Sequence, residues 1–469
     1  MSTAKPIFTF WRVMALLVLL AIAGLAALVI TSAMARPTIS VDYTEELESI
    51  AREYQPEHAS EPNRRDDFIA TILDMNRISS ARFPGESIDV QALLEPEPER
   101  RTSTPLRDEP TWEQERQRAE EFLNALDEEG FFDRAQSLSG IRHAVNEIPQ
   151  GMSVIEASFS EHFNMLEHLG PMRQLTRVLS IQAVRDARAG RTDDALANIE
   201  SAFATARLAS TEPFLISGLV GVACHAVACS NAIRIVTEHR LTSEQLDELA
   251  RIADRQRTLP FEYAIRTEKT IIIDAIQRTY SDNGKGDGHF LPGYFATLTN
   301  DPNTTPIPRT NALNVVGRFM PSRARTVETI DNMFDAAIEY TRNPSHNTAA
   351  LDSAAEEAEL LADDHLLLGI LLPAINRSAQ NAPFVTTYIA ALRTAIALEH
   401  YFLDTNAYPE TLDALVPTYL DHLPEDPTAR DNRLIYTPSQ DRATYTLHAV
   451  GRNKQDNNGE EDDITFTPE

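Results

Sequence analysis

The sequence predicts a mainly α protein with an N-terminal transmembrane helix, a helical middle domain and a small α+β domain at the C-terminus. Three observations lead to this prediction. An uncharged apolar run covers Val13 to Ile30, helical spacing of apolar residues continues to about Glu339, and two short strand-like runs appear only after Pro427. The expected divisions are an anchor at 1–35, a stalk at 36–111, a helical domain at 112–375 and the C-terminal domain at 376–469.

The apolar run at Val13–Ile30 is long enough to cross a bilayer. Its eighteen residues extend about 27 Å as a helix, against a hydrocarbon core of about 30 Å. Lys5 and Arg12 precede it, so the positive-inside rule leaves the N-terminus in the cytoplasm. We expect a single-pass protein of the cytoplasmic membrane with its bulk in the periplasm. The alternative is a cleaved signal peptide ending at Ala33-Met34-Ala35, which also exports the chain.

The stalk and the start of the helical domain follow from apolar spacing. Tyr43–Tyr54 and Asp66–Ile78 have the period of amphipathic helices, and Trp112–Leu126 has it again. Between them, Glu95–Pro105 is rich in proline and charge, which is typical of a linker. We therefore expect helices on both sides of a linker.

A helical hairpin is predicted at Pro171–Ala189 and Asp193–Ala209. Its turn resembles that of a tetratricopeptide hairpin, although no second copy follows at that period. Gly190 is the expected C-cap of the first helix, and Thr192 or Asp193 is the expected N-cap of the second.

The run Phe214–Val236 is the second most apolar stretch. Its polar and small residues favour a buried helix over a second membrane span. Cys224 and Cys229 lie five residues apart on this helix, so they face different directions and are expected to be small buried residues, not a disulfide. Thr242 and Gln245 predict a capping box at the next helix.

Composition and motifs exclude several functions. The formal net charge of −28 excludes nucleic acid as a partner and disfavours broad docking on an anionic membrane surface. There is no Gly-x-Ser-x-Gly motif, no dinucleotide fingerprint and no zinc-like cysteine spacing. Glu161-His162 and Glu167-His168 place their histidines six apart, which does not fit the spacing of four in metalloprotease helices. We therefore expect no enzyme activity and no small-molecule substrate.

The C-terminal region has a distinctive order of segments. A helical run at Ala391–Phe402 leads into Asn406–Pro409, then Leu423–Pro427, a hairpin around Ser439–Arg442 and an acidic loop from Gly451 to Ile464. This order resembles the C-terminal half of G-type pseudopilins, the major pilin-like subunits of type II secretion systems. The resemblance covers a module of about a sixth of the chain, and the usual pilin start is not found at residue 1.

The resemblance implies calcium in the acidic loop. Hard Ca²⁺ takes six to eight oxygen ligands, and Asp456 and Asp463 are expected to provide them with Asn453, followed by Asp462. Asn453 and Lys454 stand where the family has Asp and Gly. The alternative is a solvated acidic tail, the usual meaning of a run of charge.

We predict an extracytoplasmic interaction or scaffold protein, held by its N-terminal helix and linked through envelope protein partners to secretion or pilus-like assembly. Two alternatives remain. One is an enzyme whose site lies between helices of the middle domain, with ligands far apart in sequence. The other is a helical binding module for a peptide or an envelope polymer.

Overall fold

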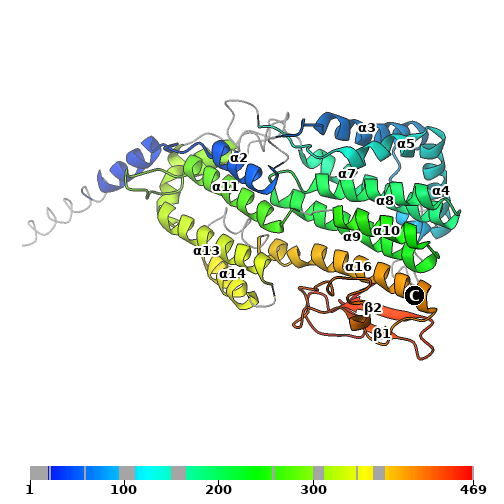
Figure 1. The fold of residues 1–469 in the computed structure, drawn as a ribbon. Helices are drawn as coiled ribbons and strands as arrows, with labels where there is room; N and C mark the ends of the chain where they lie inside the picture. The colour runs from blue at the N-terminus through cyan, green and yellow to red at the C-terminus, as the bar shows by residue number, and fades with distance from the viewer. Residues whose placement is uncertain are drawn as a thin grey trace, which may run out of the picture.

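The computed structural model describes residues 20, 23–56, 60–94, 111–148, 165–255, 259–298, 311–344, 347–362 and 375–466. Over these ranges the chain is mainly helical, with a three-stranded antiparallel sheet near the C-terminus (Figure 1). The predicted fold class is confirmed at this level. Three predicted features lie outside the described residues. They are the Glu95–Pro105 linker, His162, and the part of the apolar run from Val13 to residue 22, except Leu20.

The elements have the following bounds: α2 (Tyr43–Tyr54), α3 (Arg65–Arg82), η2 (Val90–Leu93), α4 (Trp112–Glu128), α5 (Phe131–Ala135), η3 (Gln136–Gly140), α7 (Met165–Arg188), α8 (Thr192–Ala209), α9 (Leu215–Glu238), α10 (Ser243–Arg255), α11 (Phe261–Thr279), α12 (Pro292–Leu298), η5 (Asn311–Phe319), α13 (Arg323–Arg342), α14 (Thr348–Ala362), α16 (Ala382–Thr405), η6 (Leu412–Leu415), β1 (Ile435–Pro438), β2 (Tyr445–Ala449) and β3 (Ile464–Thr465).

Helix starts follow local capping chemistry. The predicted capping box of α10 is confirmed, since Thr242 and Gln245 each accept a hydrogen bond from the other's backbone N–H. A second capping box joins Thr111 and Gln114 at the start of α4. The α2 helix begins and ends at the predicted residues, after Asp42 as its cap.

The α7–α8 hairpin is confirmed, with one correction at its turn. Gly190 has a φ of 77° and ends the first helix as predicted, because only glycine adopts this conformation without strain. The predicted N-cap at Thr192 or Asp193 is wrong: α8 already begins at Thr192, and Arg191 occupies the cap without a side-chain hydrogen bond. Buried Asp186 holds this turn by accepting hydrogen bonds from Arg191 and Asn198.

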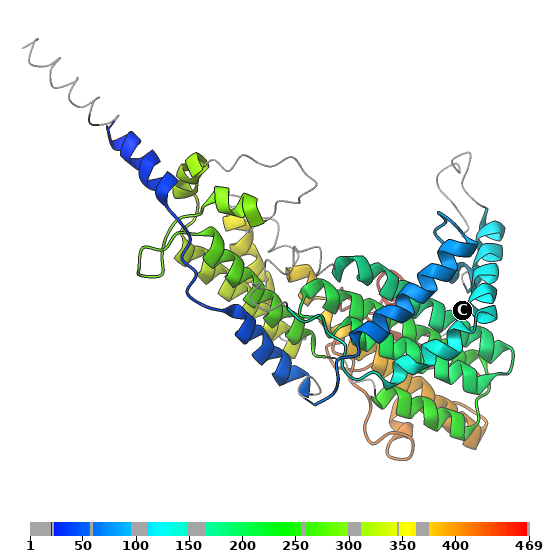
Figure 2. The ribbon, with the colours of Figure 1, turned by 90° about the horizontal axis from the view of Figure 1, so that it is seen from above.

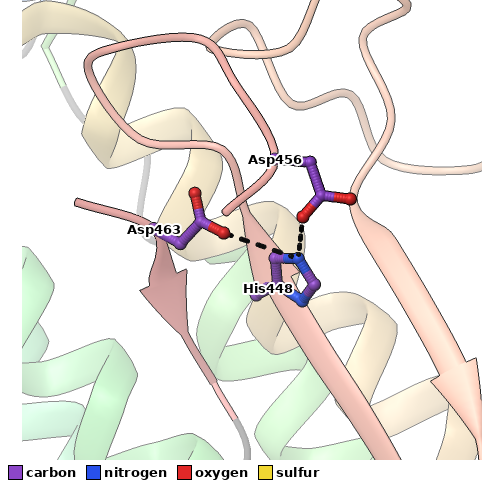
Figure 3. A group of neighbouring side chains, drawn as sticks. All are labelled: His448, Asp456 and Asp463. Atoms are coloured by element: carbon purple, nitrogen blue, oxygen red, sulfur yellow. Dashed lines mark hydrogen bonds and ion pairs between the residues drawn. The ribbon is translucent and has the colours of Figure 1, made fainter. Parts of the chain in front are cut away.

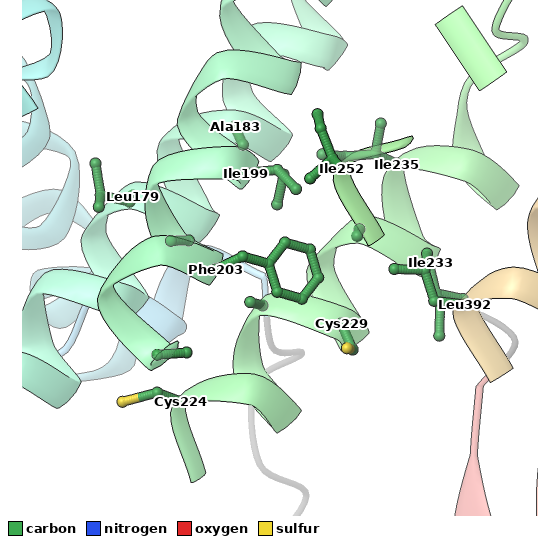
Figure 4. Close-up of a cluster of buried hydrophobic side chains, with 14 of the residues drawn as sticks. Leu179, Ala183, Ile199, Phe203, Cys224, Cys229, Ile233, Ile235, Ile252 and Leu392 are labelled. Atoms are coloured by element: carbon green, nitrogen blue, oxygen red, sulfur yellow. The ribbon is translucent and has the colours of Figure 1, made fainter. Parts of the chain in front are cut away.

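The main hydrophobic core lies between α7, α8, α9, α10 and α16 (Figure 4). Phe203 of α8 is fully buried at its centre, among Ile199, Cys229 and Ile233. Both cysteines are free and buried, as predicted. Burial raises the pKa of the Cys224 thiol to about 11, so it stays protonated and unreactive at neutral pH.

Helix α9 is the one helix of the described chain that is long and apolar enough to cross a membrane, and 61% of its most apolar window is buried in the protein. It packs closely on its neighbours. A Cβ at Gly218 would come within 2.7 Å of the Ala264 side chain, and one at Gly221 would meet Ser210 at the same distance. The packing agrees with the prediction of a buried helix.

A second core joins α11, α13 and α14, with Phe334 and Tyr280 fully buried in it. Within the described residues, the C-terminal region shares the main core. Helix α16 packs on α9 and α10 with one face and on the sheet with another, so Leu392 and Leu447 belong to the main core. The predicted boundary between 375 and 376 therefore crosses a continuous hydrophobic core, and the division into domains stays a prediction.

The sheet has the order β1-β2-β3, with both pairs antiparallel. The β1–β2 hairpin turns around Ser439–Arg442 as predicted, pairing Pro438 with Tyr445. The β2–β3 pair sets Ala449 opposite Ile464 and brings the two ends of the acidic loop together.

Candidate metal centre in the C-terminal loop

The C-terminal loop (residues 450–463) leaves strand β2 and returns as strand β3. Gly451, the second residue of the loop, has a φ of 64°, and a Cβ at this position would come within 1.9 Å of the Asp462 carbonyl oxygen. Glycine is required there because the two arms of the loop touch, and any larger residue would push them apart. The contact places the acidic end of the loop directly beside its start.

Three side chains converge at the base of the loop (Figure 3). The Nε2 atom of His448 lies 3.0 Å from Asp456 Oδ1 and 3.7 Å from Asp463 Oδ2. One donor atom from each of the three lies within 4.8 Å of the others. His448 lies in strand β2 and Asp456 lies in the loop. Asp463 is the last residue of the loop, directly before β3. We call these residues the His-Asp-Asp cluster.

The carboxylates of the cluster also hold the loop backbone. Asp463 Oδ2 accepts hydrogen bonds of 2.8 Å from the N–H groups of Asn457 and Gly459. Asp456 Oδ1 accepts one from the N–H of Asn458. The hydrogen bond from His448, followed by that backbone bond, lowers the pKa of the Asp456 carboxyl, so it is ionised at neutral pH.

One oxygen of the cluster is left without a partner. The Asp463 side chain is fully buried, and its Oδ1 atom accepts no hydrogen bond from the described residues. A buried carboxylate oxygen without a donor is unfavourable, because it has lost its water and gained nothing in exchange. A bound cation beside the cluster would remove this cost.

The four predicted ligands separate into two pairs. Asp456 and Asp463 meet in the cluster. Asn453 and Asp462 instead pair with each other, since the Asn453 N–H donates to Asp462 Oδ2 at 2.7 Å. The Asn453 side chain turns inward to the loop and donates to Asn457 Oδ1. Calcium binding by all four residues stays a prediction.

Lys454, which stands where the resembled family has glycine, does not point at the cluster. Its ammonium group donates to the Pro344 carbonyl and to Thr348 Oγ1, and lies over the Tyr340 ring. Burial lowers the pKa of Lys454. The lysine charge is used to attach the loop to the region around α13 and α14, away from the carboxylates.

Sequence reasoning missed His448. A histidine three residues before Gly451, at the end of a strand-like run, was the available signal. This histidine alone does not indicate a metal ligand, because only the β2–β3 pairing shows that the end of β2 lies against residues 456 and 463.

The donor set indicates the class of ion. A tetrahedral zinc ion with ligands at about 2.0–2.1 Å holds neighbouring ligand atoms about 3.3 Å apart. The two distances from His448 Nε2, 3.0 and 3.7 Å, lie on either side of this value, and a zinc ion bound there would take the place of the proton that Nε2 donates to Asp456. An imidazole nitrogen suits zinc or another transition metal, whereas calcium takes oxygen alone.

Apart from the cluster, the helical region has a cavity of about 300 Å³ between α9, α11, α13 and α16. Arg342 at its wall forms a bidentate pair with Glu262, at 2.6 and 3.0 Å. His225 donates its Nδ1–H to the Gly221 carbonyl, and burial lowers its pKa to about 4, so the ring is neutral. The charged groups of this cavity are therefore paired with each other.

Comparison with known proteins adds no relative. No family model, no curated protein and no solved structure matches this chain. The resemblance to G-type pseudopilins rests on the order of segments alone and stays a prediction.

Proposed function

We propose that the chain is a membrane-anchored extracytoplasmic scaffold protein that carries a pseudopilin-like module. The observation behind this is the apolar helix Ala23–Met34. It projects from one end of the body (Figure 2), and its side chains are exposed, with Leu25 at 61% and Ile30 at 57%. A helix that exposes this much apolar surface is unfavourable in water and suits a bilayer.

Two further features support this proposal. Lys5 and Arg12 lie before the apolar run, which orients the body outward under the positive-inside rule. The C-terminal sheet lies on the flank of the body beside α16, in the half away from the anchor (Figure 1), where partners in the envelope can reach it. Helix α16 followed by a small antiparallel sheet is also the element order that the pseudopilin resemblance implies.

The enzyme alternative has weaker support. The cavity beside His225 offers a neutral imidazole and an arginine that is already paired with Glu262. Neither arrangement supplies the activated nucleophile or the poised acid and base that hydrolysis or group transfer needs.

The anchor and the scaffold role are tested separately. Membrane fractions washed with high salt and carbonate should keep the full-length chain, and a protease added to the periplasmic side should digest the body. Recovery of a shortened chain in the soluble periplasm would show cleavage after Ala35 instead. Affinity purification from detergent extracts should then recover envelope proteins, and a monomer without partners would contradict the scaffold role.

We propose further that the His-Asp-Asp cluster binds a divalent cation, and that the ion is zinc or a similar transition metal in place of the calcium implied by the sequence. The buried Asp463 carboxylate with an unpartnered oxygen supports an ion. The imidazole of His448 supports the choice of metal, because nitrogen ligands favour zinc.

Thermal unfolding of the full-length chain tests this proposal. Chelator-treated protein should gain melting temperature with ZnCl₂, and His448→Ala should abolish the gain. Asp462→Asn is the matched control, since this acidic residue belongs to the loop but not to the cluster. If no divalent ion raises the melting temperature, the proposed metal site is wrong. A gain with CaCl₂ that survives His448→Ala would favour the oxygen site that the sequence predicted.

A further inference from the structure

The end of the body next to the anchor helix exposes apolar side chains. In η5, Phe319 is 81% exposed and Val316 is 48% exposed. Met34 at the end of the anchor helix and Ile39 beyond it are also exposed. An exposed phenylalanine beside other exposed apolar residues marks a surface that another apolar phase covers.

Hydrogen bonds fix this surface to the anchor. Arg318, the residue before Phe319, donates from Nε to Ser32 Oγ at 2.6 Å and from Nη2 to Thr31 Oγ1 at 3.2 Å. Both hydroxyls belong to the last turns of the anchor helix, and Ser32 is fully buried there. The position of η5 relative to the anchor is therefore set by side-chain contacts.

On its other side η5 packs tightly against the body. A Cβ at Gly317 would come within 1.8 Å of the Phe290 carbonyl oxygen, so backbone meets backbone at this point. Contacts with both the body and the anchor therefore fix the position of η5, the element that carries Phe319 and Val316.

The height of η5 above the bilayer follows from helix geometry. The apolar run ends at Ile30, and Ser32 lies about 3 Å further along the axis, at 1.5 Å per residue. The polar layer on each side of the hydrocarbon core is about 5–7 Å thick, given a total of 40–45 Å and a core of about 30 Å. With the proposed anchor in a bilayer, Arg318 bonded at Ser32 lies in the headgroup layer.

We propose that η5 and the anchor exit form a lipid-contact surface, with the side chains of Phe319 and Val316 inserted into the bilayer interface and Arg318 at the level of the phosphates. The proposal rests on the proposed membrane anchor. An aromatic residue beside an arginine is the composition typical of membrane interfaces. The surface restricts the tilt of the body, and so determines how far the C-terminal module stands from the membrane.

Spin labels on the full-length chain in phosphatidylglycerol and phosphatidylethanolamine vesicles test this proposal. Single cysteines are introduced by Phe319→Cys, by Val316→Cys as a second reporter, by Leu25→Cys on the anchor helix and by Leu73→Cys on distant α3. Leu73 is exposed, so its label reports water. Native Cys224 and Cys229 are buried and stay unlabelled.

The readout is the ratio of relaxation by oxygen, which enters lipid, to relaxation by a water-soluble nickel chelate. We expect this ratio at positions 319 and 316 to exceed that at 73 several-fold and to approach that at 25. A ratio at 319 and 316 equal to that at 73, with 25 in lipid, overturns the lipid-contact surface while the anchor stands. Labels shielded from both reagents indicate a covering protein and also overturn it. A ratio typical of water at position 25 overturns the anchor itself.

Discussion

The core around Phe203 and the C-terminal loop are both well packed, but different forces hold them. Phe203 is surrounded by apolar side chains of α7, α8, α9 and α10, so burial of hydrocarbon stabilises this region. The C-terminal loop is held by Asp456 and Asp463, whose carboxylates accept hydrogen bonds from loop N–H groups.

The difference predicts different responses to the solvent. Apolar packing changes little with moderate ionic strength, chelators or the charge of single residues, whereas a loop closed around ionised carboxylates depends on all three. The core and the loop nevertheless share one hydrophobic cluster through α16, so damage to either is measurable in the unfolding of the same chain.

The largest effect is expected in the core. Phe203→Ala removes a fully buried ring, and such substitutions cost about 3–5 kcal/mol in the free energy of unfolding. Urea denaturation followed by circular dichroism measures the loss. Leu73→Ala is the control, since this exposed residue should change stability by about 0.5 kcal/mol at most. The zinc-induced rise in melting temperature should survive Phe203→Ala, and its loss would contradict the separation of the two regions.

A second prediction concerns a buried charge within the helical body. Burial raises the pKa of the Glu212 carboxyl from 4.5 to about 7, although Arg65 and the Asn146 N–H face it. Between these two values the folded protein keeps a proton that the unfolded chain has released. The free energy of unfolding therefore falls as pH rises through this window, by about 1.4 kcal/mol per unit and about 3 kcal/mol in total.

Urea denaturation at pH 5 and pH 8, with Glu212→Gln as the comparison, tests this dependence. The glutamine variant lacks the contribution of Glu212, so its stability relative to that of the wild type should rise between pH 5 and pH 8. His225 acts in the opposite direction: its pKa of about 4 in the folded state makes stability fall as pH drops below 6.5. Because the two groups nearly cancel in the wild type, the decisive quantity is the difference between wild type and Glu212→Gln. The same pH dependence in both chains would rule out the effect of Glu212.

The third prediction moves to the loop. Asp463→Asn keeps the shape of the side chain but removes its charge, and so weakens the hydrogen bonds from Asn457 and Gly459. We expect a loss of about 1–2 kcal/mol, the difference between charged and neutral hydrogen bonds. The zinc-induced shift in melting temperature should vanish in the same variant. An unchanged shift would remove Asp463 from the ligand set.

The helical body and the C-terminal loop differ in how much of their structure could be predicted from the sequence. In the helical body, apolar spacing and caps located α2, α4, the α7–α8 hairpin and α9, because such signals act within a few residues. Thr242 and Gln245 were found in this way. The start of α8 was misplaced, since Thr192 has the residue type of a cap but already has helical geometry.

In the loop, residue types were informative but their grouping was not. Asp456 and Asp463 were expected to act together, and they do meet. His448 was missed and Asn453 was expected beside them, because strand pairing decides which side chains converge. Lys454 looked like a neighbour of the carboxylates in the sequence, but its left-handed backbone, with a φ of 58°, accompanies a side chain that bonds the helical body.

The smallest effect is expected at Lys454, where the two regions meet. Lys454→Met keeps the apolar stem but removes both hydrogen bonds, to the Pro344 carbonyl and Thr348 Oγ1. We expect a loss of about 1 kcal/mol in the free energy of unfolding, as for a typical hydrogen bond. Hydrogen exchange should become faster in the C-terminal loop, while exchange around Phe203 stays unchanged. Faster exchange in both places would mean that the loop and the core open together. The two regions would then differ in the kind of contacts that hold them, but not in the free energy needed to open them.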